Sequence, residues 1–279
     1  MTEEEQMLME VLKCRRVDLY LEKRGLTDEQ KQLFEQMQSR RIHGEPLQYI
    51  IGHADFMGFK LFVDARVLIP RPETELMVES AVDIMNKMYG GKTLTVLDLG
   101  TGSGNIAIAL AKHFPDCLIT ALDISRDALD VARRNAHFHR VFERIKFSNE
   151  DMSYFLQQPL KEEQKFDLVI SNPPYIPTDY LSRLPKEVQK EPWLALEGGE
   201  DGLDYVRYLL AFTPNVMRES GKLIFEIWDG QSELVYKLNE YFRRFRHIEF
   251  GRDYVKTNRF AICVLKSIHP FTFEEFTTN

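Results

Sequence analysis

The stretch LTVLDLGTGSGNIAIALAKHF, residues 94–114, decides the fold of this protein. It begins with a short apolar run typical of a buried strand, and residues 105–114 have the apolar spacing of an amphipathic helix. Between them lie Gly100, Gly102 and Gly104, which let backbone amides approach a ligand closely and adopt conformations that other residues avoid. We therefore predict a strand, a ligand-binding glycine loop and a helix.

Short apolar runs and amphipathic segments continue to alternate after this stretch. We expect strands at 94–100, 118–124, 144–151, 166–172, 221–227 and 259–265, and helices at 105–114, 126–138 and 232–242. Such alternation indicates βαβ units and a doubly wound, mostly parallel sheet.

The segments before the glycine loop divide the chain into three expected parts. Residues 1–52 contain only helical patterns and predict a helical domain. Residues 53–70 contain two short β-rich runs, which predict a hairpin linker. Pro72 then stands near the start of a further helix, where its fixed φ is favourable. The third part, an α/β domain, is expected to span 71–279.

Composition limits the classes of function. Of the 279 residues, 44% are hydrophobic and 28% charged, which predicts a soluble globular protein with a substantial core. No apolar run reaches the roughly 18 residues of a membrane span. The net charge of −7 gives no long-range attraction to nucleic acid, so no stable nucleic-acid binding is expected. The histidine spacing predicts no metal site, and the three unpaired cysteines, Cys14, Cys117 and Cys263, favour the reducing cytoplasm.

The residues around the glycine loop bear on the ligand it would hold. Asp123 ends the next strand, where a carboxylate can accept hydrogen bonds from two ribose hydroxyls. The segment 102–107 also matches G-x-G-x-x-A, so a nicotinamide dinucleotide remains an open interpretation. Asp98 would face the phosphates of a dinucleotide unfavourably, but it suits a ligand with an ammonium or sulfonium group. Asp98 followed by three glycines resembles S-adenosylmethionine-dependent methyltransferases.

A second motif, SNPPYIP at 171–177, leaves the end of a predicted core strand. Pro173 restrains Asn172 to extended conformations, and neither Pro173 nor Pro174 has an N–H to satisfy. The corner therefore presents two acceptors, the Asn172 side-chain oxygen and the Pro173 carbonyl, which suit one planar –NH2 group. Tyr175 supplies a flat face for stacking. The alternative is a proline-stiffened loop without function.

This corner suits the methylation of an amide or an aryl amine. An amide nitrogen is a poor nucleophile because its lone pair is delocalised into the carbonyl. Accepting both of its N–H bonds fixes the nitrogen and raises its electron density, and a methyl group held in line completes a near-attack geometry. No base of ordinary pKa can remove the proton first, so no catalytic histidine is expected.

NPPY after a strand, with DLGTGSG upstream, resembles methyltransferases that act on –NH2 groups. Three further stretches resemble the HemK/PrmC family of release factor glutamine methyltransferases, namely GEPLQYIIGHADFMGFKLFVDARVLIPRPETE at 44–75, EPWLALEGGEDGLDYVR at 191–207 and FEIWDGQ at 225–231. The resemblance implies a class I, Rossmann-like domain with a seven-stranded sheet, preceded by a small helical domain and a β-hairpin. It also implies methyl transfer from S-adenosylmethionine to the glutamine of the Gly-Gly-Gln motif in peptide chain release factors.

The resemblance assigns roles to individual residues. It implies that the helical domain grips the release factor and that Asp123 holds the ribose, with Met152 flanking the adenine. Asn172 would touch both cofactor and substrate. The cofactor's methionine part would lie against Asp98, Gly100, Thr101, Gly102, Ser103 and Gly104, and the glutamine pocket and its chemistry would depend on Asn172, Pro173, Pro174 and Tyr175.

Two alternative functions have distinct signatures. A methyltransferase acting on the exocyclic amine of a base in DNA or RNA would use the same pocket logic, because a flipped base offers –NH2 and a ring. The net acidity and the lack of a basic, aromatic-rich recognition domain argue against it. A module that binds release factors without turnover is the other alternative, and the intact NPPY argues against that.

Overall fold

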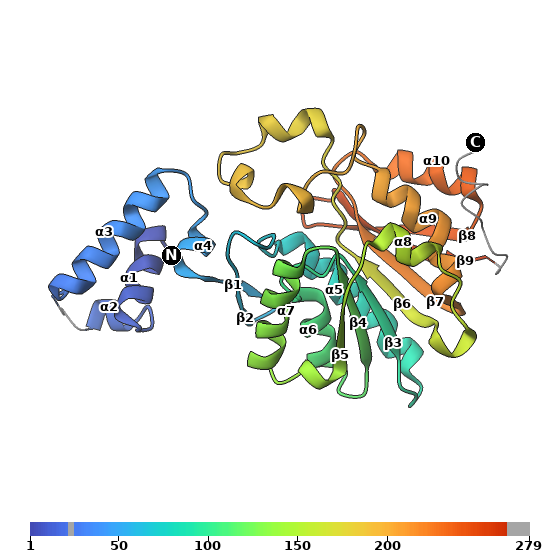
Figure 1. Cartoon of the computed structure of the whole chain (residues 1–279), viewed down its shortest axis with the longest axis horizontal. Coiled ribbons are helices and arrows are strands. Elements are labelled where there is room, and N and C mark those ends of the chain that lie inside the picture. The colour runs from blue at the N-terminus through green and yellow to red at the C-terminus, as the bar shows by residue number, and fades with distance from the viewer. Residues whose placement is uncertain (22–24, 267–279) are drawn as a thin grey trace.

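The computed structural model describes residues 1–21 and 25–266, which form a helical N-terminal part, a β-hairpin and an α/β domain (Figure 1). The N-terminal part consists of α1 (Glu3–Leu12), α2 (Asp18–Leu21), α3 (Asp28–Ile42) and α4 (Leu47–Ile51). The Thr27 side chain accepts a hydrogen bond from the Gln30 amide, at 3.2 Å, and so caps α3. The helices close on a small core of their own, made by Met7, Val11, Met37, Leu47 and Ile50.

The predicted hairpin forms between the two larger parts. Strands β1 (His53–Phe56) and β2 (Phe59–Phe62) pair antiparallel through a turn at Met57 and Gly58, both with positive φ. The hairpin is fastened to the α/β domain by the buried Asn135 side chain, which accepts from the Phe62 amide at 2.7 Å and donates to its carbonyl at 3.0 Å. Helix α5 (Pro72–Tyr89) follows, with proline at its first position as predicted.

The α/β domain contains the expected seven-stranded sheet. Its strands are β3 (Thr95–Leu99), β4 (Leu118–Asp123), β5 (Ile145–Asn149), β6 (Phe166–Ser171), β7 (Met217–Glu226), β8 (Phe245–Arg252) and β9 (Asn258–Leu265), in the order β5-β4-β3-β6-β7-β9-β8. Strand β9 runs antiparallel to β7 and β8, and the other described strand pairs of this sheet are parallel. The order reverses between β3 and β6, and ligands of such sheets bind in the crevice at the carboxyl ends of strands at this point.

Helices cover both faces of the sheet (Figure 1). Helices α5, α6 (Asn105–His113) and α7 (Arg126–Phe138) cover one face, and α8 (Met152–Gln157), α9 (Asp204–Val216) and α10 (Ser232–Phe242) cover the other. Successive residues of β3 alternate between the two cores, with Val96 in the first and Leu97 in the second. Burial on both faces explains why the central strands read as unbroken apolar runs.

Within the described α/β domain, one strand and two α-helices have no counterpart in the sequence prediction. Strand β8 lies at an edge of the sheet, and most of its residues are partly or fully exposed, so it lacks an apolar run. Helices α8 and α9 were also not predicted, and α9 contains Pro214. In addition, β7 begins at Met217, before residue 221. In the part of the chain that the structure describes, no helix is both long enough and apolar enough to cross a membrane.

Candidate active site

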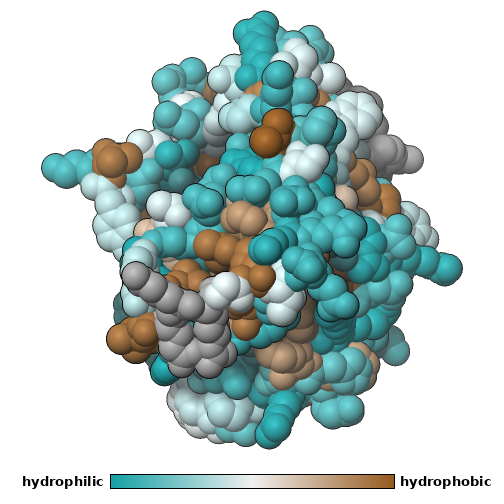
Figure 2. Space-filling model, turned by 90° about the vertical axis from the view of Figure 1, so that its left-hand side faces the viewer, coloured by the Kyte–Doolittle hydropathy of each residue, from teal (hydrophilic) through white to brown (hydrophobic). Residues whose placement is uncertain are grey.

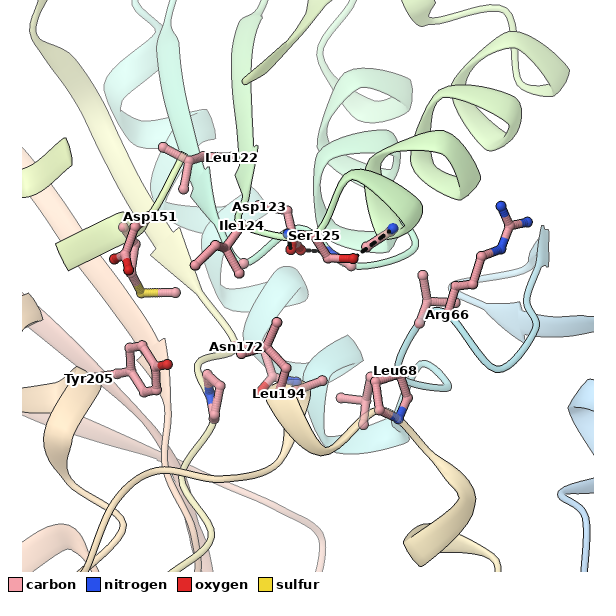
Figure 3. Close-up of a pocket in the computed structure, with 18 residues that line it drawn as sticks. Arg66, Leu68, Leu122, Asp123, Ile124, Ser125, Asp151, Asn172, Leu194 and Tyr205 are labelled. Atoms are coloured by element: carbon pink, nitrogen blue, oxygen red, sulfur yellow. Dashed lines mark hydrogen bonds between the residues drawn. The ribbon is translucent and has the colours of Figure 1, made fainter. Parts of the chain in front are cut away.

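A cavity opens at the carboxyl edge of the sheet, where small-molecule sites of such sheets are commonly found. Figure 3 shows that Asp123, Asn172 and Tyr205 approach it from different sides. This first cavity is lined by Arg66, Val67, Leu68, Gly100, Gly102, Leu122, Asp123, Ile124, Ser125, Ala128, Asp151, Met152, Asn172, Pro174, Pro192, Leu194, Ala195 and Tyr205.

Backbone hydrogen bonds hold the glycine loop against the end of β4. The Gly100 and Thr101 amides both donate to the Leu122 carbonyl, at 2.8 and 3.0 Å. All three loop glycines have positive φ, the conformation that disfavours side chains. A Cβ on Gly104 would also lie 3.2 Å from the Ala132 Cβ, so α7 requires close packing there. The loop backbone is therefore held against the first cavity.

The Asp123 carboxylate holds this loop as well as lining the cavity. Its two oxygens accept hydrogen bonds from the Gly102 amide at 2.8 Å and the Ser125 amide at 2.9 Å. Burial raises the pKa of Asp123, and these two backbone donors oppose that effect. Asp123, the residue predicted to bind the ribose, therefore lines the cavity and also sets the conformation of the neighbouring loop.

Asp98 lies beneath the loop. It is fully buried and accepts a hydrogen bond from the Thr101 hydroxyl at 2.6 Å. Burial raises the pKa of Asp98 to about 7, against the lowering effect of the Thr101 bond. The carboxylate is absent from the cavity wall, so in this structure Asp98 supports the loop from behind.

A second cavity lies on the other side of the corner after β6. Asn172 lines both cavities, whereas Tyr175 lines only the second. The remaining walls of the second cavity are Leu68, Arg71, Glu73, Ile176, Val188, Ala195, Leu196, Glu226, Ile227, Trp228 and Arg259. A ligand in one cavity can therefore meet a group from the other at Asn172.

The corner is supported by the segment that follows it. This segment contains the 3-10 turns η3 (Thr178–Arg183), η4 (Val188–Lys190) and η5 (Trp193–Ala195). The Gln231 side-chain amide donates to the carbonyls of Tyr175 and Gly202, both at 3.1 Å. A Cβ on Gly202, whose φ is +75°, would lie 2.3 Å from the Tyr175 carbonyl oxygen. Close packing against the corner therefore requires glycine at position 202, within the stretch 191–207 that resembles the family.

The same segment connects the corner to the N-terminal part. Arg41 on α3 bridges Glu3 on α1 and Glu187 before η4, with 2.7 Å contacts to both carboxylates. The buried Glu191 accepts hydrogen bonds from the Ile69 amide, at 3.0 Å, and from the Arg71 guanidinium. The segment 187–191, which leads into the cavity-lining residues Pro192, Leu194 and Ala195, is thus fastened to the helical part and to the linker.

The predicted site residues divide into two groups. Gly100, Gly102, Asp123, Met152, Asn172, Pro174 and Tyr175 line the two cavities. Asp98, Thr101, Ser103, Gly104 and Pro173 line neither of them. The sequence analysis did not identify the buried residues Thr74 and Glu226. Thr74 contacts Asn172, Glu226 contacts Tyr175, and Thr74 and Glu226 contact each other. The only signal for them was that both lie in stretches resembling the family, 71–75 and 225–231.

The cavity walls have the chemistry that a nucleoside-containing ligand requires. The side chains of Leu122, Ile124 and Met152 offer apolar surface for a flat ring, and Asp123 offers an acceptor at the same end. Over residues 1–21 and 25–266, no group of three His, Cys, Asp or Glu side chains is arranged to hold a metal ion.

Two family profiles match the chain. The profile of the PrmC N-terminal domain matches residues 2–52, and that of a methyltransferase domain matches residues 91–245. The release factor glutamine methyltransferase of Chlorobaculum tepidum is 41% identical over 266 residues, which cover 93% of this chain and 88% of that protein. The protein of the same description from Bacillus cereus is 37% identical, over 88% of this chain and 86% of that protein.

Solved structures share the fold at low sequence identity. A methyltransferase from Pyrococcus furiosus has a TM-score of 0.52 at 18% identity, and the match covers 84% of this chain and 100% of that one. The hMettl16 catalytic domain, solved with an RNA hairpin, has a TM-score of 0.58 at 12% identity, with 88% and 84% covered. At these identities the likeness concerns the fold alone.

Proposed function

Because the chain belongs to the family of release factor glutamine methyltransferases, we propose that it methylates the side-chain amide nitrogen of a glutamine in peptide chain release factors. The proposed methyl donor is S-adenosylmethionine, and the proposed target is the glutamine of the Gly-Gly-Gln motif. The observation that carries the proposal is the meeting of two cavities at Asn172, one beside the glycine loop and one beside Tyr175.

The first cavity supports the proposed cofactor site. The wall formed by Gly100 and Gly102 suits the methionine part, Asp123 suits the ribose hydroxyls, and Met152 with Ile124 suits the adenine ring. When bound there, S-adenosylmethionine would supply an electrophilic methyl group. Asp98, Thr101, Ser103 and Gly104 would act indirectly, by maintaining the loop.

The corner residues would hold and orient the glutamine amide. Asn172 Oδ1 would accept one N–H of the substrate. Pro173, whose carbonyl was predicted to accept the other N–H, lines neither cavity. Tyr175, whose hydroxyl donates to Glu226 at 2.8 Å, would present its ring to the amide plane. Fixing the nitrogen would align its lone pair with the methyl group. No general base would be needed, because the nitrogen becomes strongly acidic once the new N–C bond has formed and would then lose its proton to water.

Mass spectrometry of a purified release factor tests the proposed function. After incubation with the enzyme and S-adenosylmethionine, we expect a gain of one methyl group on the peptide that contains the Gly-Gly-Gln motif. Duplex DNA and ribosomal RNA, offered as competing substrates, should gain none. Methylation of a nucleic acid without methylation of the release factor would favour base methylation instead.

We expect Asp123→Ala to raise the dissociation constant for S-adenosylmethionine by about 10–100-fold. The change removes charge-assisted hydrogen bonds of ~1.5–3 kcal/mol, and each ~1.4 kcal/mol is a factor of ten. Calorimetry measures the affinity. Asp127→Ala, at an exposed position on α7, is the matched control. An unchanged affinity in the folded Asp123→Ala protein would contradict the ribose assignment.

A further inference from the structure

A chain of three hydrogen bonds lies behind the corner and joins elements that are distant in the sequence. Asn172 Nδ2 donates to Thr74 Oγ1 at 3.0 Å, and the Thr74 hydroxyl donates to Glu226 Oε2 at 2.6 Å. The other Glu226 oxygen accepts from the Tyr175 hydroxyl at 2.8 Å. Thr74, in the first turn of α5, is fully buried, and Glu226, at the end of β7, is 2% exposed. The Thr74 hydroxyl is therefore out of water, and Glu226 and Asn172 lie at the wall of the second cavity.

The direction of these bonds follows from the donors available. An ionised carboxylate only accepts hydrogen bonds, so the single Thr74 hydroxyl proton must point to Glu226. The Thr74 oxygen can then only accept from Asn172, and within the Asn172 amide only the –NH2 group donates. Asn172 Oδ1 is consequently turned away from Thr74. Among the described residues, none donates a hydrogen bond to this oxygen.

We propose that Glu226, acting through Thr74, is a positioning residue that fixes the amide of Asn172 with its oxygen toward the substrate –NH2 group. Through its second oxygen, Glu226 also holds the hydroxyl of Tyr175 and hence the plane of the ring. This inference rests on the proposed function. A neutral residue in place of Glu226 would leave the same space filled but would no longer impose one direction on the bonds.

Protonation of Glu226 would allow the hydrogen bonds between Glu226, Thr74 and Asn172 to reverse their direction. A protonated carboxyl can donate to Thr74 Oγ1, which frees the Thr74 proton for Asn172 Oδ1. The Asn172 –NH2 group would then face the substrate –NH2 group, so two donors would oppose each other. Rotating the amide in this way removes the acceptor that the substrate needs.

Burial raises the pKa of Glu226 to about 7, despite the hydrogen bonds from Thr74 and Tyr175 that favour the charged form. Around the same cavity, Glu73 raises this pKa further and Arg71 lowers it. Arg259 on β9 also lines this cavity. The carboxylate that orders Asn172 is present above this pKa and lost below it. We therefore expect the rate of methyl transfer to fall as the pH is lowered through about 7.

Glu226→Gln tests the role of the carboxylate. Glutamine has the same shape but accepts at only one of its two terminal atoms, so it cannot satisfy both hydroxyl donors. We expect kcat to fall by about tenfold to a hundredfold through lost alignment, with little change in cofactor affinity. The loss of rate between pH 8 and about 6 should disappear with the carboxyl group. Glu79→Gln, at an exposed position on α5, is the matched control.

Substitutions at Thr74 test the relay separately. Thr74→Val keeps the shape and removes the hydroxyl, and we expect a fall in kcat similar to that of Glu226→Gln. Thr74→Ser restores the hydroxyl and should recover most of the lost rate. A structural role of Thr74 alone would follow side-chain volume, so valine would then be tolerated better than serine.

A measurement without substrate separates this inference from the proposed function. The side-chain amide signals of Asn172, assigned by their absence in Asn172→Ala, should shift in NMR spectra of the wild-type protein as the pH passes through about 7. They should not shift in Glu226→Gln. The inference is overturned by pH-independent Asn172 signals in the wild-type protein, or by wild-type kcat in both Glu226→Gln and Thr74→Val. An absence of methyl transfer to release factors by the wild-type enzyme would instead reject the proposed function, while the NMR result would still decide the inference.

Discussion

Replacing Asn172 with alanine is expected to lower the rate of methyl transfer by about two to four orders of magnitude while the fold survives. Asn172 follows β6 and is only partly buried, so its truncation removes little of the core. It does remove the acceptor proposed for one N–H of the substrate amide. An unpaired donor in a pocket poor in water costs roughly 1–3 kcal/mol, and the nitrogen also loses its alignment.

Asn172→Asp provides the sharper comparison. Aspartate keeps an acceptor of the same shape, but it cannot donate to Thr74 as the Asn172 amide does. It would also place a negative charge near the buried Glu226 and beside the site proposed for the methyl donor. We therefore expect Asp to be nearly as slow as Ala. Single-turnover rates and melting temperatures should be measured for both variants. Wild-type rates in both, with unchanged melting temperatures, would show that the corner does not hold the substrate amide.

Removal of residues 1–52 is the second change with a large expected effect. We expect the shortened protein to bind S-adenosylmethionine normally, because both cavities are lined by residues after position 65. We expect kcat/KM for an intact release factor to fall by roughly a thousandfold. That factor corresponds to the loss of two contacts of about 2 kcal/mol each, the threshold for a hot spot in a protein interface.

The surface of the helical part supports this proposed role in recognition. Figure 2 looks onto the end of the molecule that this part forms and shows hydrophobic side chains among mostly hydrophilic ones. Leu21, Leu33 and Ile42 are exposed there, and Ile42 is 83% exposed. We expect these side chains to contact the release factor.

A full-length variant provides the control for misfolding of the shortened protein. Changing Leu21 and Leu33 to serine keeps the helical part in place and should raise KM for the release factor without changing cofactor affinity. If the shortened protein binds the cofactor and methylates the release factor at the wild-type rate, the helical part has another role.

The sequence predicted the parts of the site that depend on neighbouring residues. The glycine loop and the proline corner are set by φ preferences and by missing N–H groups, which are local properties. The central strands were also predictable, since burial on both faces gives them continuous apolar runs. Strand β8 was missed for the opposite reason, because an edge strand with exposed residues has no such run.

Other features became visible only in the tertiary structure. Thr74 and Glu226 are 152 positions apart, and no periodicity or motif reports that the first turn of α5 meets the end of β7. The same is true of the position of Asp98, which the sequence suggested as a ligand contact and which the fold places behind the glycine loop. Such contacts depend on how helices pack across the sheet.

The sequence by itself therefore determined the class of fold, the glycine loop and the position of the proline corner after a core strand, because backbone conformation and hydrophobic period are encoded within short segments. The tertiary structure alone decided which way the Asn172 amide is held and which carboxylate holds it. That orientation follows because the Thr74 hydroxyl donates its one proton to Glu226 and can then only accept a hydrogen bond from Asn172. These three residues meet only where α5, β7 and the corner after β6 come together.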